Sequence, residues 1–217
     1  MPAAEKGKTL IQCDFDGTVT LNDVSFLILD AYGNKNWRQL YNAYRDGKIS
    51  VGRFNTEAFA AVKAEKQTLL DFIKGKAELR AGFPELVAYC RRKGFRLVIV
   101  SNGLDFYIQS ILEGLGLGDV EFYAARTRLG ADGVEARYIG PAGNVVEDDF
   151  KDTYLELFQK NGYRVIYVGN GASDASPASR AAHIFATDEL LKYCQGTNLS
   201  YTPFSNFRDV IKGLESL

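Results

Sequence analysis

The stretch Cys13-Asp14-Phe15-Asp16-Gly17-Thr18-Val19-Thr20 decides how this chain is interpreted. It follows the apolar run Thr9-Leu10-Ile11, and together they predict a short buried strand over residues 9–13. Side chains two positions apart on a strand return to the same face, so Asp14 and Asp16 can face one pocket. Two carboxylates this close repel each other unless a cation lies nearby, and magnesium prefers oxygen ligands. The sequence therefore predicts a magnesium site after the first strand.

The composition indicates a globular protein that binds neither nucleic acid nor membrane. The 217 residues are 46% hydrophobic, which suits one domain with a modest insertion. The 26 basic and 27 acidic residues give a net charge of -1 without a basic stripe. No apolar stretch reaches the ~20 residues of a membrane span, and residues 1–8 lack the apolar core of a signal peptide. Three widely spaced cysteines favour a reducing cytoplasm, and the oligomeric state stays open.

Strand and helix patterns alternate along most of the chain. Alternation of this kind predicts a Rossmann-like, doubly wound parallel α/β sheet whose active crevice lies outside the carboxyl ends of its strands. A turn-like Ala131-Asp132-Gly133-Val134 segment predicts a hairpin within residues 126–138. The apolar runs that predict strands are residues 9–13, 95–100, 120–124, 163–168 and 183–186.

Residues 21–80 interrupt the alternation because they contain recurrent helical faces and no convincing strand. We expect residues 1–20 and 81–217 to form the catalytic core, and residues 21–80 to form a helical cap inserted after the first strand. This insertion comes directly after the two aspartates, so it could close over them as a lid. The alternative is a helical subdomain that does not contact the site.

Polar residues follow four of the predicted strands or begin the helices after them. A carboxylate, a hydroxyl, a lysine and a further carboxylate at one edge of a sheet suggest phosphoryl transfer, which depends on positioning and electrostatics. The four segments are Asp14/Asp16, Ser101-Asn102-Gly103, Lys151 and Gly169-Asn170-Gly171-Ala172-Ser173-Asp174.

In this order, the four segments resemble the four motifs of the haloacid dehalogenase-like superfamily, in its phosphatase branch. The helical insertion resembles the cap of the phosphoserine phosphatase-like group. Residues 101–106 and 190–204 resemble the methionine-salvage phosphatases, which act on a phosphorylated methylthio-diketone enol. The resemblance covers most of the chain.

The resemblance implies a role for each motif. Asp14 would be the nucleophile that forms an aspartyl-phosphate, and its other oxygen would bind Mg²⁺. Asp16 would protonate the leaving oxygen and then deprotonate water, while its backbone carbonyl reaches the metal. Phosphate binding is implied for Ser101, Asn102, Gly103 and Lys151.

The fourth motif departs from the family because Asn170 stands where an aspartate usually ligates magnesium. An asparagine oxygen can ligate the metal, but it removes one negative charge, so metal binding would be weaker. Asp174 is the expected acidic ligand or an acid next to the ligands, and Asn170 is a possible neutral ligand. In the cap, we expect substrate contacts from Asn22, Asp23 and Arg53.

The expected function is a magnesium-dependent phosphomonoesterase that acts on a small phosphorylated metabolite through Asp14. The methionine-salvage intermediate and phosphoserine are the leading candidate substrates. Two alternatives stay open. A dehalogenase on the same scaffold would not need Asp16. A weakened or non-catalytic protein that binds a phosphorylated metabolite would account for Asn170.

Overall fold

The computed structural model describes residues 8–130 and 132–217, and at its centre lies a seven-stranded sheet with the order β4-β3-β2-β1-β5-β6-β7. Every neighbouring pair is parallel except β3 and β4, which form an antiparallel hairpin. The strands are β1 (Thr9–Cys13), β2 (Arg96–Leu104), β3 (Glu121–Gly130), β4 (Gly133–Arg137), β5 (Arg164–Gly169), β6 (His183–Ala186) and β7 (Tyr201–Pro203).

The strand β1 lies in the middle of the sheet because its apolar residues are covered on both sides. Leu10 and Ile11 are fully buried. Cys13 pairs in register with Ile99 of β2 and with Val168 of β5. The carboxyl ends of β1, β2 and β5 therefore meet at one edge, and the polar segments that follow them emerge together.

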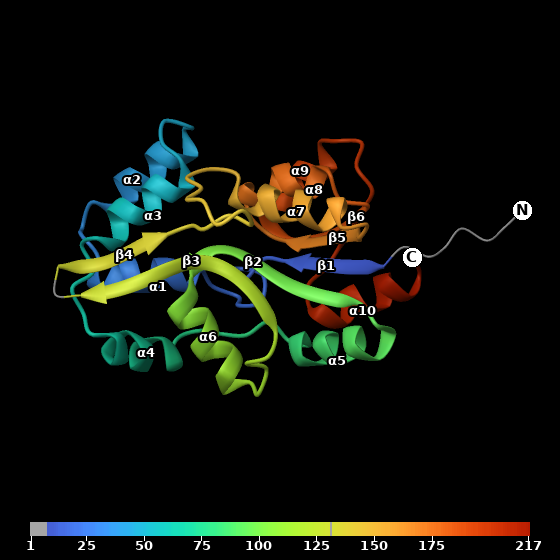
Figure 1. Cartoon of the computed structure of the whole chain (residues 1–217), viewed down its shortest axis with the longest axis horizontal. Helices are drawn as coiled ribbons and strands as arrows, with labels where there is room; N and C mark the ends of the chain where they lie inside the picture. Colours follow the sequence, from blue (N-terminus) through green and yellow to red (C-terminus); the bar gives the residue numbers. More distant parts are fainter. Residues whose placement is uncertain (1–7, 131) are drawn as a thin grey trace, which may run out of the picture.

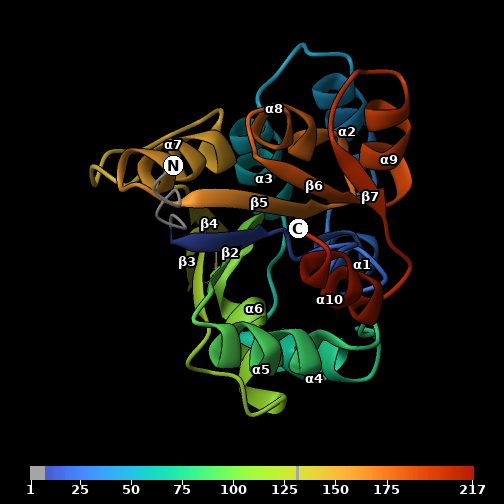
Figure 2. The same ribbon diagram turned by 90° about the vertical axis from the view of Figure 1, so that its right-hand side faces the viewer.

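Helices cover both faces of the sheet (Figures 1 and 2), which confirms the doubly wound α/β class. One face carries α5 (Phe83–Lys93), α6 (Asp105–Gly114) and α10 (Phe207–Glu215). The other carries α7 (Phe150–Lys160), α8 (Ala175–Ser179) and α9 (Asp188–Gln195). Among the described helices, none is both long and apolar enough to cross a bilayer.

Four further helices lie beyond the carboxyl end of β1 (Figure 1). The chain enters this group of helices after Thr20 and leaves it at Leu79, and these two residues form an antiparallel bridge. Asp23 begins α1 by accepting a hydrogen bond from the amide of Phe26 at 3.0 Å. The four helices are α1 (Val24–Tyr32), α2 (Trp37–Arg45), α3 (Val51–Phe59) and α4 (Lys66–Lys74).

The predicted strands over residues 9–13 and 183–186 coincide with β1 and β6, and the predicted hairpin is formed by β3 and β4. The strand β7 was not predicted because it has only three residues and lacks an apolar run. Residue 131 of the predicted turn lies outside the described residues.

Candidate active site

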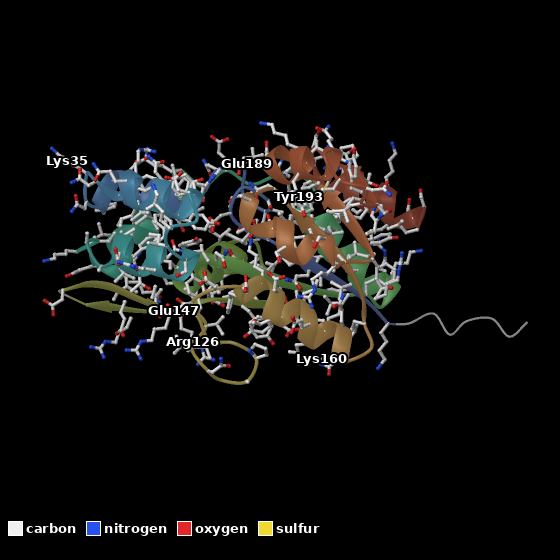
Figure 3. The ribbon with its side chains drawn as sticks, turned by 90° about the horizontal axis from the view of Figure 1, so that it is seen from above. Lys35, Arg126, Glu147, Lys160, Glu189 and Tyr193 are labelled. Atoms are coloured by element: carbon white, nitrogen blue, oxygen red, sulfur yellow. The ribbon has the colours of Figure 1, made fainter. Side chains whose placement is uncertain are left out.

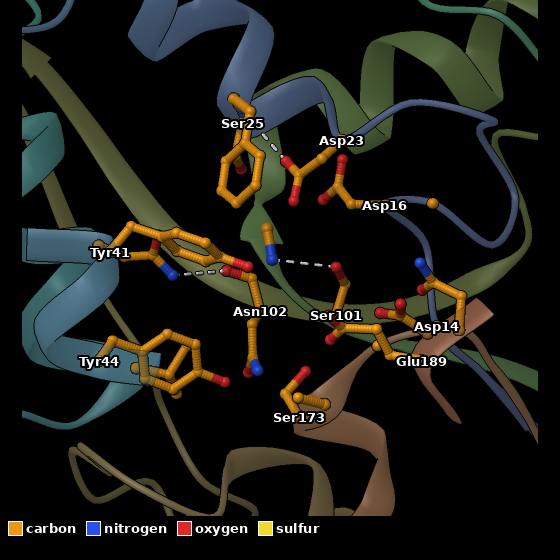
Figure 4. A pocket seen from close by; sticks show the side chains of 18 of the residues that line it. Asp14, Asp16, Asp23, Ser25, Tyr41, Tyr44, Ser101, Asn102, Ser173 and Glu189 are labelled. Carbon is orange, nitrogen blue, oxygen red and sulfur yellow. Dashed lines mark hydrogen bonds between the residues drawn. The ribbon is translucent and has the colours of Figure 1, made fainter. Parts of the chain in front are cut away.

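A cavity of about 360 Å³ opens at the sheet edge where β1, β2 and β5 end, and α1, α2 and α3 form its other side. The site residues predicted from separate segments of the sequence converge on it (Figure 4). Those that line it are Asp14, Asp16, Asp23, Ser101, Asn102, Gly103, Lys151 and Asn170. Asp174 lies directly behind them, and Asn22 and Arg53 do not line the cavity.

Lys151 lies between two carboxylates on the floor of the cavity. Its Nζ is 2.7 Å from Asp14 Oδ1 and 2.6 Å from Asp174 Oδ1, and all three side chains are buried. Burial alone lowers the pKa of Lys151, but the two carboxylates raise that pKa above its ordinary value. The lysine is therefore a fixed ammonium ion held against the predicted nucleophile.

Asp14 carries the surplus negative charge of this group. Desolvation and the neighbouring Asp174 raise the pKa of Asp14 to about 7, although Lys151 acts in the opposite direction. A single ammonium ion can neutralise only one of two carboxylates. A further cation beside Asp14 would lower its pKa again and stabilise the carboxylate form that a nucleophile needs.

The hydrogen bonds that Asp174 makes differ from those expected of a direct metal ligand. Its Oδ1 accepts hydrogen bonds from Lys151 and, at 2.7 Å, from the Tyr167 hydroxyl. Its Oδ2 accepts from the amides of Asn170 at 2.9 Å and Gly171 at 2.8 Å. These four donors saturate the two oxygens. Asp174 is thus placed to anchor Lys151 and the loop after β5 rather than to ligate a metal directly.

Two other oxygens converge in front of Asp14. The Thr18 hydroxyl lies 2.9 Å from Asn170 Oδ1 and 3.3 Å from Asp14 Oδ2. Gly17 has φ 74°, and a Cβ there would lie 2.2 Å from the side-chain Nδ2 of Asn170, so this loop requires glycine. Within residues 8–130 and 132–217, no cluster of three or more His, Cys, Asp and Glu side chains is arranged to hold a metal. A metal here would need amide and main-chain oxygens as well, and such hard oxygen donors fit Mg²⁺.

Asp16 is held at both carboxylate oxygens. Oδ1 accepts from the Val24 amide at 2.9 Å, and Oδ2 accepts from the Tyr107 hydroxyl at 2.5 Å. Desolvation, followed by repulsion from Asp23, raises the pKa of Asp16 to about 8. The pKa of Asp23 is itself raised to about 6 by burial. Burial therefore favours the protonated form of Asp16, which is the form required of a general acid.

The segment after the middle of β2 supplies hydrogen-bond donors to the cavity. Ser101 Oγ accepts from the Gly103 amide at 2.9 Å, which leaves the hydroxyl proton of Ser101 available for a ligand. The Asn102 carbonyl is held by the side chain of Asn55 at 3.0 Å and by the Tyr138 hydroxyl. Asn102 Oδ1 is buried without a hydrogen-bond partner among the described residues.

Aromatic side chains of α1, α2 and α3 line one side of the cavity; we call Phe26, Tyr41, Tyr44 and Phe54 the aromatic wall. The Tyr44 and Phe54 rings stack with centroids 6.1 Å apart, and the Phe26 and Tyr41 rings meet edge to face at 4.9 Å. Spacing alone predicts the helical face of Trp37, Tyr41 and Tyr44 as cap core. Only Trp37 is buried behind the wall, whereas the two tyrosines line the cavity (Figure 4).

Two of the three expected cap contacts lie elsewhere. The Asn22 side chain donates to the Lys76 carbonyl at 3.1 Å and so joins the segments before α1 and after α4. Arg53 is exposed and pairs with Glu57 at 2.6 Å along the same helix. Instead, Arg45 at the end of α2 reaches the cavity. Its guanidinium contacts Glu189 at 2.8 Å, so an ion pair crosses the rim from α2 to α9.

Comparison with known proteins agrees with this geometry. Residues 11–178 match the haloacid dehalogenase-like hydrolase family. The chain is 30% identical to the 2-hydroxy-3-keto-5-methylthiopentenyl-1-phosphate phosphatase of Geobacillus thermodenitrificans, over 98% of each chain. It is 28% identical to the enzyme of that name from Brevibacillus brevis, over 97% and 96% of the two chains. A phosphoserine phosphatase with a phospho-aspartyl intermediate analogue shares the fold, with TM-score 0.72, 22% identity and coverage of 96% and 99%. The chain is therefore an enzyme of the haloacid dehalogenase-like hydrolase family.

Proposed function

We propose that this enzyme is a magnesium-dependent phosphomonoesterase in which Asp14 forms an aspartyl-phosphate. The observation that carries the proposal is the buried Asp14 carboxylate, held 2.7 Å from the Lys151 ammonium and facing the same cavity as Asp16 and Ser101. The phosphatase names of the curated relatives, which align over nearly the whole chain, support it.

The chemistry assigned to these side chains has two steps. An oxygen of Asp14 attacks the phosphorus, and the bond from phosphorus to the leaving oxygen breaks while Asp16 gives that oxygen a proton. Asp16 then takes a proton from water, which attacks the phosphorus, so that inorganic phosphate leaves and Asp14 is regenerated. The Lys151 ammonium and the Ser101 hydroxyl stabilise the negative charge on the phosphoryl oxygens.

The residues that would hold magnesium are Asp14 through its carboxylate, Asn170 through its side-chain oxygen, and Asp16 through its main-chain carbonyl. When bound, Mg²⁺ supplies positive charge beside the transferred phosphoryl group. Asn170 in place of an aspartate leaves one negative charge fewer around the ion, so we expect weaker binding than an aspartate would give.

We propose that residues 21–80 act as a cap over the core of residues 1–20 and 81–217, and that the cap selects an apolar substrate tail. The aromatic wall offers apolar contact opposite the phosphate site. Among the described residues that line the cavity, the two cations, Lys151 and Arg45, are already paired with carboxylates. A substrate carboxylate, such as that of phosphoserine, would find no free partner. The methylthiopentenyl phosphate in the relatives' names fits better.

Turnover of defined substrates tests this proposal. The purified enzyme should release phosphate from the methylthiopentenyl-1-phosphate substrate far faster than from phosphoserine, and chelation of magnesium should stop the reaction. Asp14→Asn should abolish turnover while the protein still melts cooperatively. Turnover that persists in Asp14→Asn would exclude the aspartyl-phosphate, and a preference for phosphoserine would exclude the apolar tail.

Asn170 favours one other function, a weakened or non-catalytic protein that binds a phosphorylated metabolite. This alternative predicts that inorganic phosphate binds in a calorimetric titration, although no substrate in a metabolite panel turns over. Magnesium-dependent turnover by the unmodified enzyme would eliminate it.

We also propose a cytoplasmic location. The three cysteines, Cys13, Cys90 and Cys194, are buried free thiols, as expected in a reducing compartment. Recovery of the native protein in a periplasmic or secreted fraction would contradict this.

A further inference from the structure

We propose that Tyr107 is a positioning residue that holds the carboxyl group of Asp16 for proton transfer, with Ser25 of α1 orienting the tyrosine hydroxyl. This inference rests on the proposed function, because it concerns the acid that protonates the leaving oxygen. It gives a role to a buried tyrosine from α6 that the mechanism above leaves unused.

The hydrogen bonds around Tyr107 run in one direction. Its hydroxyl donates to Asp16 Oδ2 at 2.5 Å and lies 2.8 Å from Ser25 Oγ. Tyr107 and Ser25 are both buried. A phenol has one proton, so the hydroxyl that donates to Asp16 must accept from Ser25. Burial raises the pKa of Tyr107 well above its ordinary value, so the phenol stays a donor. Chained hydrogen bonds of this kind reinforce one another.

Gly103 provides the space in which this contact forms. A Cβ at this position would lie 2.1 Å from the Tyr107 hydroxyl and 2.3 Å from Asp16 Oδ2. Its φ lies outside the left-handed region, so the backbone itself does not require glycine here. The missing side chain at the end of β2 therefore lets the tyrosine of α6 reach the acid.

The other oxygen of Asp16 is held by the cap. The Val24 amide, which begins α1, donates to Asp16 Oδ1 at 2.9 Å, and Ser25 is the next residue of that helix. One carboxyl group is thus held between a core helix and a cap helix. Its plane is fixed by both contacts when α1 is in the position seen here, which aligns the acid while the cap covers the cavity.

The nature of the leaving group separates this role from a structural one. An alkoxide is a poor leaving group and needs a proton from Asp16 as the bond breaks, whereas a nitrophenolate leaves readily without one. Loss of a positioning contact to the acid should therefore slow the hydrolysis of an alkyl phosphate much more than that of an aryl phosphate. A general loss of structure would slow both equally.

The test compares kcat/KM for 2-phenylethyl phosphate and p-nitrophenyl phosphate in magnesium. Tyr107→Phe keeps the ring and removes one oxygen, and we expect about a tenfold loss with the alkyl substrate and less than about twofold with the aryl substrate. Ser25→Ala should show the same selectivity with a smaller loss. The matched control is Tyr154→Phe, because that buried tyrosine donates to the Ile139 carbonyl at 3.0 Å, away from the cavity.

Asp16→Asn sets the reference, because it should show the largest difference between the losses of kcat/KM for the two substrates. Adding Tyr107→Phe to Asp16→Asn should cause no further loss. Equal losses on both substrates, or an additive loss in the double variant, would overturn the inference while the proposed function stands. If Tyr107→Phe does not melt cooperatively, Ser25→Ala decides the same comparison. If the unmodified enzyme hydrolyses neither substrate nor the methylthiopentenyl phosphate, the proposed function and this inference fall together.

Discussion

The cavity has a floor, formed by Lys151, Asp14 and Asp174, and a roof, formed by the aromatic wall and Arg45. The side chains of these two regions are held in place in different ways. On the floor, Lys151, Asp14 and Asp174 are buried and joined by contacts of 2.7 Å and 2.6 Å. On the roof, the aromatic wall presents ring surface, and the ion pair between Arg45 and Glu189 at the rim is exposed. The difference indicates that the floor is specified atom by atom, because an unpaired buried charge is costly, whereas the roof contributes through contact area and tolerates graded change.

The largest effect is expected from removing the lysine of the floor. Lys151→Met leaves two buried carboxylates without their cation, so we expect the free energy of unfolding to fall by about 3–5 kcal/mol. Turnover should be lost as well. Urea unfolding and phosphate release measure the two effects. Lys160→Met is the matched control, because Lys160 lies exposed on the same helix (Figure 3), and it should change neither quantity. An equally stable Lys151→Met protein would show that the floor is not held by charge pairing.

A smaller change is expected from restoring a charge to the floor. Asn170→Asp adds a carboxylate beside Asp14, so the metal-free protein should melt at a lower temperature and Mg²⁺ should bind about tenfold more tightly. Melting in chelator and in magnesium measures both effects, because a bound ligand stabilises the folded state. Asn161→Asp makes the same charge change at an exposed position and should leave the magnesium response unaltered. An unchanged magnesium affinity in Asn170→Asp would place the ion away from residue 170.

Substitutions in the roof should change substrate binding rather than the rate of the chemical step. Tyr44→Ala removes part of the aromatic wall, so KM for the methylthiopentenyl phosphate should rise about tenfold, with kcat nearly unchanged. Inhibition by inorganic phosphate, which has no tail, should stay the same. Tyr193→Ala is the control, because this tyrosine lies exposed on α9 (Figure 3). A fall in kcat with KM unchanged would move Tyr44 from recognition into the chemistry.

Much of the floor could be predicted from the sequence because its chemistry is tied to strand ends. Asp14, Ser101 and Asn170 each follow an apolar run, and parallel strands bring such positions to one edge. The saturation of Asp174 could not be predicted in the same way. Two of its donors are amides of the loop after β5, and a loop conformation leaves no pattern in the sequence.

The roof was harder to predict, because helical spacing shows which residues share a face but not what that face contacts. Tyr41 and Tyr44 were expected in the cap core, yet the face they share borders the cavity. Arg53 and Arg45 could not be ranked from the sequence, since the direction of each side chain depends on how α2 and α3 pack. Tyr107 and Gly103 show the same limit, because their contact with Asp16 joins three separate segments.

The smallest effect is expected at the rim, where Arg45 and Glu189 join roof to floor. Their side chains are 40% and 44% exposed, and pairs of this kind contribute about 0–1 kcal/mol in salt. Glu189→Gln should therefore change kcat/KM by less than about threefold at low ionic strength, and by less still in high salt because exposed charges are screened. A double-mutant cycle with Arg45→Met measures the coupling between the two. A coupling above about tenfold that survives high salt would show that the rim pair closes the cap, so that the roof, like the floor, would depend on a specific charge contact.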